Sequence, residues 1–112
     1  EFQGDRDTIA YSPGDDRDLH LLRQLQAEGI PVVSVFLTGR PLWVNRELNA
    51  SDAFVVAWLP GTEGAGVADV LFAGPDGSVG HDFTGKLAFS WPRSLGQTVL
   101  NIGDEPYDPL RS

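Results

Sequence analysis

The sequence has no cysteine and no methionine among its 112 residues. Without cysteine there is no disulfide and no thiolate metal site, which leaves the cellular compartment open. Basic residues are few, with 8 Lys and Arg against 16 Asp and Glu and a net charge of −8. This charge repels phosphate backbones, so we expect no nucleic-acid partner. No apolar run is long enough to span a membrane, and we expect no membrane partner either.

The beginning of the chain indicates a processed or cut product. It opens EFQGD, without an initiating methionine and without the charged-then-apolar segment of a secretory signal. The length predicts one domain or part of one.

The most informative stretch is residues 53–66, AFVVAWLPGTEGAG. Its apolar run over 53–59 predicts a strand buried on both faces, as in a parallel sheet covered by helices. A glycine-rich loop follows the strand, and ligands of such sheets bind at the carboxyl ends of the strands. The stretch therefore predicts an α/β fold and a candidate site together.

The rest of the chain predicts alternating helices and strands. Asp15, Asp16 and Asp18 suit the first turn of a helix, and Gly29 suits its left-handed cap. The further elements that we expect are a strand at 32–37, a short helix at 42–49, a helix at 64–72 whose small residues let it lie close to the sheet, and a strand at 86–91. Helices between strands imply a parallel sheet, and its exposed edges allow self-association by strand pairing.

Individual side chains support only modest site predictions. Glu63, in the loop after the second strand, suits the first turn of the following helix, where it satisfies free N–H groups. Arg40 ends the first strand and can orient a polar ligand, although pairing with a loop carboxylate is favoured. The three tryptophans Trp43, Trp58 and Trp91 are expected in the core, with sugar stacking by Trp43 or Trp91 as the alternative.

The sequence predicts no metal and no cofactor. The two histidines, His20 and His81, are far apart and have no second ligand at metal spacing. The acidic loop at 76–82 lacks the downstream glutamate of the hand-type calcium motif. A phosphate cradle at 60–66 lacks the lysine that such loops use, and Glu63 would oppose an anion.

Several motifs in series resemble the second domain of family-3 glycoside hydrolases, closest to the exo-acting β-glucan glucohydrolases. The resemblance covers nearly the whole chain and rests on the motifs TGRP (38–41), AWLPGTEG (57–64), DFTGKL (82–87), SWP (90–92), NIGD (101–104) and PYDPL (106–110). It implies a six-stranded, three-layer α/β sandwich with a mostly parallel sheet, of which this chain lacks the N-terminal side. The sandwich packs beside a β/α barrel in the parent enzyme.

The resemblance also implies an activity and a catalytic residue. Such enzymes remove β-linked glucose from chain ends with retention of configuration, which uses two carboxyl groups about 5–5.5 Å apart. The nucleophile belongs to the barrel, which is absent here. The acid/base is a glutamate in a segment Glu-x-x-Gly-Asp, which matches residues 1–5 and implies that role for Glu1. We therefore expect the isolated chain to be inactive.

The remaining expectations concern organisation and location. We expect residues 1–92 to form the partial sandwich and residues 93–112 to form an extended tail packed on it. The resemblance implies a secreted or periplasmic enzyme and a β-linked glucoside substrate. A noncatalytic carbohydrate-binding or docking module is the alternative. The loop at 73–82 is longer than the usual link of the family, and its role is open.

Overall fold

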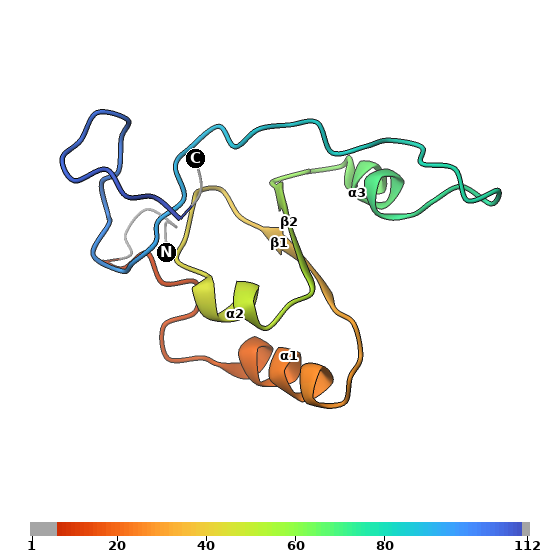
Figure 1. The fold of residues 1–112 in the computed structure, drawn as a ribbon, viewed down its shortest axis with the longest axis horizontal. Helices are drawn as coiled ribbons and strands as arrows, with labels where there is room; N and C mark the ends of the chain where they lie inside the picture. The colour runs from red at the N-terminus through yellow and green to blue at the C-terminus, as the bar shows by residue number, and fades with distance from the viewer. Residues whose placement is uncertain (1–6, 111–112) are drawn as a thin grey trace.

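The computed structural model describes residues 7–110, and Figure 1 shows the order of elements in this part of the chain. They are α1 (Arg17–Ala27), β1 (Val33–Leu37), α2 (Asn45–Asn49), β2 (Ala53–Trp58) and α3 (Gly64–Leu71). The two strands pair in parallel, and α2 lies in the connection between them. The α/β class and the parallel sheet are therefore confirmed.

The ends of α1 follow the sequence signals. Asp15 accepts a hydrogen bond from the Arg17 backbone N–H at 3.1 Å and pairs with the Arg17 guanidinium at 2.7 Å. The side-chain hydrogen bonds from Arg17 hold the pKa of Asp15 below its usual value. At the other end Gly29 has φ +72°, and its N–H donates to the Gln26 carbonyl. The predicted left-handed cap is confirmed.

The short helix starts later than expected because the chain before it is extended. Trp43 lies in a parallel bridge with Ala10, in which the Trp43 N–H donates to the Ile9 carbonyl at 2.7 Å. Helical turns therefore begin at Asn45 rather than at position 42.

The core lies on one face of the sheet. Phe36 of β1 packs there with three other buried side chains, Leu42, Val44 and Trp91. The Phe36 ring meets Tyr11 edge-on, with 5.1 Å between the ring centroids. Residues from distant parts of the sequence are thereby removed from water together, which is the main force that holds this unit closed.

The opposite face of the sheet is open in the described part of the chain. Val33, Val35 and Leu37 of β1 are 55%, 40% and 59% exposed. The side chains of β2 are exposed at Ala53 and only partly buried beyond it. The prediction that residues 53–59 are buried on both faces is therefore wrong for this chain, because no helix within residues 7–110 covers this side.

The position of α3 explains the open face. No residue of α3 is buried, and Figure 1 shows the helix apart from α1 and α2, which lie side by side. A Cβ atom built on Gly64 or Gly66 would meet no atom within 4 Å. The expectation that small residues bring this helix close to the sheet is therefore wrong here.

Residues 82–90 contain no strand, so the strand predicted at 86–91 is also wrong. This stretch crosses the end of the sheet, where Leu87 joins the margin of the core and Phe89 meets Trp58 with 6.0 Å between ring centroids. Its weak alternation thus reflects contacts with the core and not pairing in a sheet.

The segment after Trp91 is held to the body by hydrogen bonds. The Leu110 N–H donates to the Trp91 carbonyl at 2.8 Å, and the hydroxyls of Tyr107 and Ser90 lie 2.7 Å apart. Arg93 pairs with Asp108 at 3.2 Å. These contacts are consistent with a packed tail, while the boundary between residues 92 and 93 stays a prediction.

Candidate functional site

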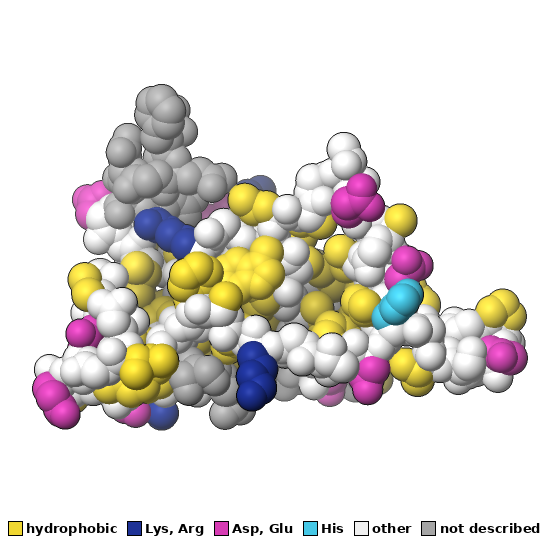
Figure 2. All heavy atoms as spheres, turned by 90° about the horizontal axis from the view of Figure 1, so that it is seen from above, with side chains coloured by type: hydrophobic (Ala, Val, Ile, Leu, Met, Phe, Trp, Pro, Cys, Tyr) yellow, Lys and Arg dark blue, Asp and Glu magenta, His cyan; other side chains and the backbone are white. Residues whose placement is uncertain are grey.

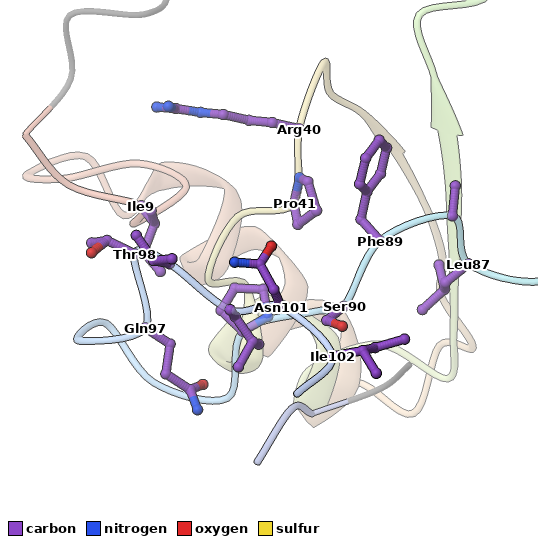
Figure 3. A pocket seen from close by; sticks show the side chains of 14 residues that line it. Ile9, Arg40, Pro41, Leu87, Phe89, Ser90, Gln97, Thr98, Asn101 and Ile102 are labelled. Carbon is purple, nitrogen blue, oxygen red and sulfur yellow. The ribbon is translucent and has the colours of Figure 1, made fainter. Parts of the chain in front are cut away.

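A cavity of about 570 Å³ lies beyond the carboxyl end of β1 (Figure 3). We call it the Arg40 cavity. Its wall is formed by Ile9, by the turn at Arg40 and Pro41, and by side chains from residues 87–92 and 97–102. The position agrees with the rule that ligands of parallel sheets bind at the carboxyl ends of strands.

Figure 2 shows one face of the molecule, on which hydrophobic side chains gather in the middle. The turn that carries Arg40 is rigidly held. Thr38 is 7% exposed, and its hydroxyl donates to the Arg40 carbonyl at 2.6 Å. The Arg40 N–H donates back to the same hydroxyl at 3.3 Å. A Cβ added at Gly39 would lie 3.4 Å from the Leu59 side chain, which is van der Waals contact.

Arg40 is partly buried, and its guanidinium has no hydrogen bond or ion pair within residues 7–110. The favoured pairing with a loop carboxylate is therefore not found in this part of the chain. Figure 3 shows the side chain extended along the side of the cavity where Ile9 lies. Arg40 is the one charged residue among the described residues that line the cavity. The cavity is thus locally cationic in a chain of net charge −8.

The other polar side chains of the cavity differ in whether they already form hydrogen bonds. Gln97 accepts from the N–H groups of Arg93 and Ser94 and donates to the Asp108 carbonyl at 2.9 Å, so its amide is occupied. The side chains of Thr98 and Asn101 form no hydrogen bond within residues 7–110. They can therefore bond to an incoming group. Sequence reasoning noted Asn101 only as part of a family motif and did not single out Thr98.

The backbone of Trp58, next to this cavity, is in a strained conformation. Its φ is +55°, which is unfavourable for a bulky side chain. The register shifts at the same point, so that Leu37 pairs with Trp58 and Ala57 is passed over. The ring then lies 6.0 Å from Phe89, a cavity residue, and 6.1 Å from Trp91, between centroids. No signal in the sequence indicated this conformation.

Glu63 lies at the N-cap of α3, where it was expected, but its side chain makes no capping hydrogen bond. Only its backbone takes part, since its carbonyl accepts from the Gly66 N–H at 3.0 Å. Glu63 is exposed and does not line the Arg40 cavity. The structure therefore leaves it as a helix-start residue.

The tryptophans leave little surface for a sugar. Trp91 is 4% exposed and lies in the core, as expected. Trp43 donates from its ring nitrogen to the Arg93 carbonyl at 3.2 Å, and the Arg46 guanidinium lies 5.6 Å from its ring centroid. Trp58 is only partly buried, at the margin of the core.

A second, smaller cavity of about 240 Å³ lies between α1 and the sheet and was missed by sequence reasoning. Glu47 of α2 lines it, with 6% exposure and one carboxylate oxygen that has no hydrogen-bond partner within residues 7–110. Asp18 also lines it and accepts from the Tyr11 hydroxyl at 2.8 Å. Burial and this hydrogen bond, with the charges of Asp18, Glu47 and Asp15, raise the pKa of Tyr11.

The described residues contain no cluster of His, Asp and Glu that could hold a metal ion. Asp76 instead accepts from the Ser78 hydroxyl at 2.6 Å and from its N–H at 3.0 Å, which lowers the pKa of Asp76. Within the same part of the chain, no helix has the length and apolar character needed to cross a membrane. Glu1 lies outside the described residues.

Comparison with known proteins decides the family. The model of the glycosyl hydrolase family 3 C-terminal domain matches residues 2–110. The chain belongs to this family. The resemblance seen in the motif series is thereby confirmed, and the Arg40 cavity is a feature of a family-3 C-terminal domain.

Individual relatives agree with this assignment. The chain is 42% identical over 103 residues to a periplasmic beta-glucosidase of Salmonella typhimurium and 32% identical over 87 residues to a beta-xylosidase of Formosa agariphila. These matches cover 87% and 77% of this chain but only 12% and 11% of the two relatives.

A solved relative has the same fold. The structure of an exo-1,3/1,4-beta-glucanase from a Pseudoalteromonas species is 59% identical to this chain, with a TM-score of 0.92. The match covers 96% of this chain and 17% of the relative. The chain thus spans less than a fifth of the length of the relatives it matches.

Proposed function

We propose that this chain is part of a retaining, exo-acting β-glucoside hydrolase, to which it supplies the acid/base carboxylate and part of the pocket wall. The match of residues 2–110 to the family-3 C-terminal domain carries the proposal. The names of two relatives, a beta-glucosidase and an exo-1,3/1,4-beta-glucanase, support β-linked glucosides as the substrate class. The 59% identity to the exo-glucanase, against 32% and 41% to two relatives named as xylosidases, favours glucosides over xylosides.

Glu1 is the proposed acid/base. The proposal rests on the resemblance of EFQGD at residues 1–5 to the Glu-x-x-Gly-Asp segment of the family. In retaining hydrolysis this carboxyl group first protonates the leaving oxygen while the second carboxylate attacks the sugar carbon. It then removes a proton from the water that releases the glycosyl intermediate. The second carboxylate, the nucleophile, is assigned to the barrel part of the enzyme.

It follows that this chain alone is inactive, because one of the two carboxyl groups is missing. The proposed location is secreted or periplasmic, in keeping with the periplasmic relative. No cofactor is proposed, since acid/base and nucleophilic steps by two carboxyl groups complete the reaction.

The alternative, a noncatalytic carbohydrate-binding module with Trp43 or Trp91 as the stacking platform, has less support. Stacking needs an open ring face, whereas Trp91 is buried and an arginine lies over Trp43. Fluorescence of the isolated chain titrated with cello-oligosaccharides is the simple check, and we expect no shift.

The test of the proposed function is turnover by the enzyme that contains this chain, with Glu1→Gln as the variant. Retaining enzymes that lose the acid/base still form the intermediate from activated aryl glucosides, and azide can then take the place of activated water. We expect activity on unactivated glucans to fall by about a hundredfold or more, with azide restoring turnover of p-nitrophenyl β-glucoside. Unchanged activity on both substrates would move the acid/base to another residue.

A further inference from the structure

We propose that the Arg40 cavity binds an acidic loop from the barrel part of the enzyme, and that this docking positions the segment that carries Glu1. Arg40 is then a positioning residue and not a catalytic one. This inference rests on the proposed function, because it assigns a role in the same reaction.

The charge of the cavity identifies the kind of partner. A partly buried guanidinium is costly unless a counter-charge or several hydrogen-bond acceptors satisfy it. Neither is present within residues 7–110, and no Asp or Glu of that range lines the cavity. A carboxylate matches the fork of an arginine with two parallel hydrogen bonds. A neutral glucan would accept hydrogen bonds but leave the charge without a counter-ion.

The remaining polar groups suit a peptide loop. The side chains of Thr98 and Asn101 have no hydrogen bond within the described residues, and each can pair with the backbone of an incoming segment. Three apolar side chains of the cavity, Phe89, Val99 and Ile102, are exposed by 60%, 73% and 86%. Exposed apolar side chains around a few polar groups are typical of a surface that another protein segment covers.

Most of the enzyme lies outside this chain and can provide that segment. The chain covers 17% of the related exo-glucanase and 12% of the related beta-glucosidase. The acidic loop therefore comes, in this proposal, from the same polypeptide, and the cavity of about 570 Å³ gives room for several residues of it.

The cavity is also connected to the catalytic segment. Ile9 lines the cavity, and its carbonyl accepts from the Trp43 N–H at 2.7 Å. The Tyr11 N–H donates to the Trp43 carbonyl at 3.2 Å, so two hydrogen bonds to Trp43 hold the strand-like segment around Ile9. Glu1 stands eight residues before Ile9, which limits their separation to about 28 Å. A loop bound in the cavity would fix one end of the segment that presents Glu1.

The experiment uses the full-length enzyme with Arg40→Gln and Arg40→Ala, assayed on two aryl β-glucosides. A misplaced acid slows the departure of a poor leaving group such as phenol, which must be protonated as it leaves. The departure of 2,4-dinitrophenol needs no proton and is not slowed. We expect kcat/KM on phenyl β-glucoside, which reports the glycosylation step, to fall about a hundredfold, the loss that misplacing a catalytic group by 1 Å can cause. On the dinitrophenyl substrate we expect kcat/KM to fall less than about threefold, because its leaving group needs no proton. There kcat should fall and azide should restore it, because the same carboxyl group acts as base when water releases the intermediate. Arg40→Lys should recover only part of the rate on phenyl β-glucoside. Lysine keeps the positive charge but cannot form the two parallel hydrogen bonds of an arginine with a carboxylate.

Arg23→Ala is the matched control, because Arg23 is an exposed arginine outside the Arg40 cavity. It should leave both rates unchanged. Circular dichroism of each variant separates misfolding from misplacement, and Arg40→Gln serves if Arg40→Ala does not fold.

Two outcomes would overturn the inference while the proposed function stands. One is an equal loss of kcat/KM on both substrates, or no loss on either. The other is a variant whose kcat is unchanged but whose KM for oligosaccharides exceeds that of the wild type by a factor that grows with their length. That result would make the cavity a glucan subsite. A wild-type enzyme that hydrolyses no β-glucoside would instead overturn the proposed function, and this inference with it.

Discussion

Replacing Glu47 by leucine should stabilise the chain, although it removes an ion pair. The carboxylate is buried, and its contact with Arg46 is long, at 3.8 Å between Glu47 Oε1 and an Arg46 guanidinium nitrogen. The same guanidinium nitrogen lies closer to Asp16, at 2.9 Å. Arg46 therefore keeps a counter-charge when Glu47 is lost, and the substitution leaves no unpaired buried cation at this position.

The magnitude follows from two opposing terms. Attraction between charges about 4 Å apart is worth about 4 kcal/mol at an effective dielectric constant of 20, whereas desolvation costs several kcal/mol for each ion. The other oxygen of Glu47 adds a penalty, because it has no hydrogen-bond partner within residues 7–110. Replacement of buried ion pairs by apolar side chains is neutral or stabilising by about 1–4 kcal/mol. We expect a gain of about 1–2 kcal/mol here, because Arg46 is only partly buried.

Urea unfolding of the chain, followed by tryptophan fluorescence, measures this difference. With a slope of about 2 kcal/mol/M, the midpoint should rise by about 0.5–1 M for Glu47→Leu. Glu47→Gln should gain less, because its amide keeps polar atoms that need partners in the same place. Glu63→Leu, at an exposed site, should shift the midpoint little. A lower midpoint for Glu47→Leu would refute the reasoning and point to an unrecognised partner of the free oxygen.

Two further predictions concern the ends of α1. Asp15→Asn should make stability less sensitive to acid: the pKa of Asp15 is lowered in the folded chain, mainly by hydrogen bonds from the Arg17 side chain. Its contribution is therefore present above the unfolded pKa of about 3.9 and is lost as the pH falls through the folded value. Urea midpoints measured from neutral to acidic pH should converge for the two proteins, and parallel curves would contradict this. Gly29→Ala should cost about 1 kcal/mol, because φ is +72° while the added Cβ meets no atom within 4 Å. An unchanged urea midpoint for Gly29→Ala would mean that the helix end adopts another conformation at no cost in the free energy of unfolding.

The features that the sequence predicted correctly depend on neighbours within a few residues. The β-branched runs predicted both strands of the parallel sheet, and three carboxylates with Gly29 predicted the limits of α1 to within two residues. The motif series predicted the family, because several short patterns in fixed order are specific together. Glu1, the acid/base implied by that resemblance, stays a prediction because it lies outside the described residues.

The features that the sequence did not predict depend on contacts between distant segments. The apolar run at 53–58 is compatible with burial on both faces, but whether a helix covers the second face depends on the rest of the domain, and α3 does not. The stretch at 86–91 has the alternation of a strand, but residues 86–90 form none, and only Trp91 at its end takes part in a bridge. Arg40 was expected to meet a carboxylate. Only the three-dimensional arrangement brings residues 9, 40 and 87–102 around it and shows that none of the described residues lining the cavity is acidic. Periodicity and caps are local and can be read from the chain, whereas cavities, strain at Trp58 and unpaired charge arise only when separate segments are packed together.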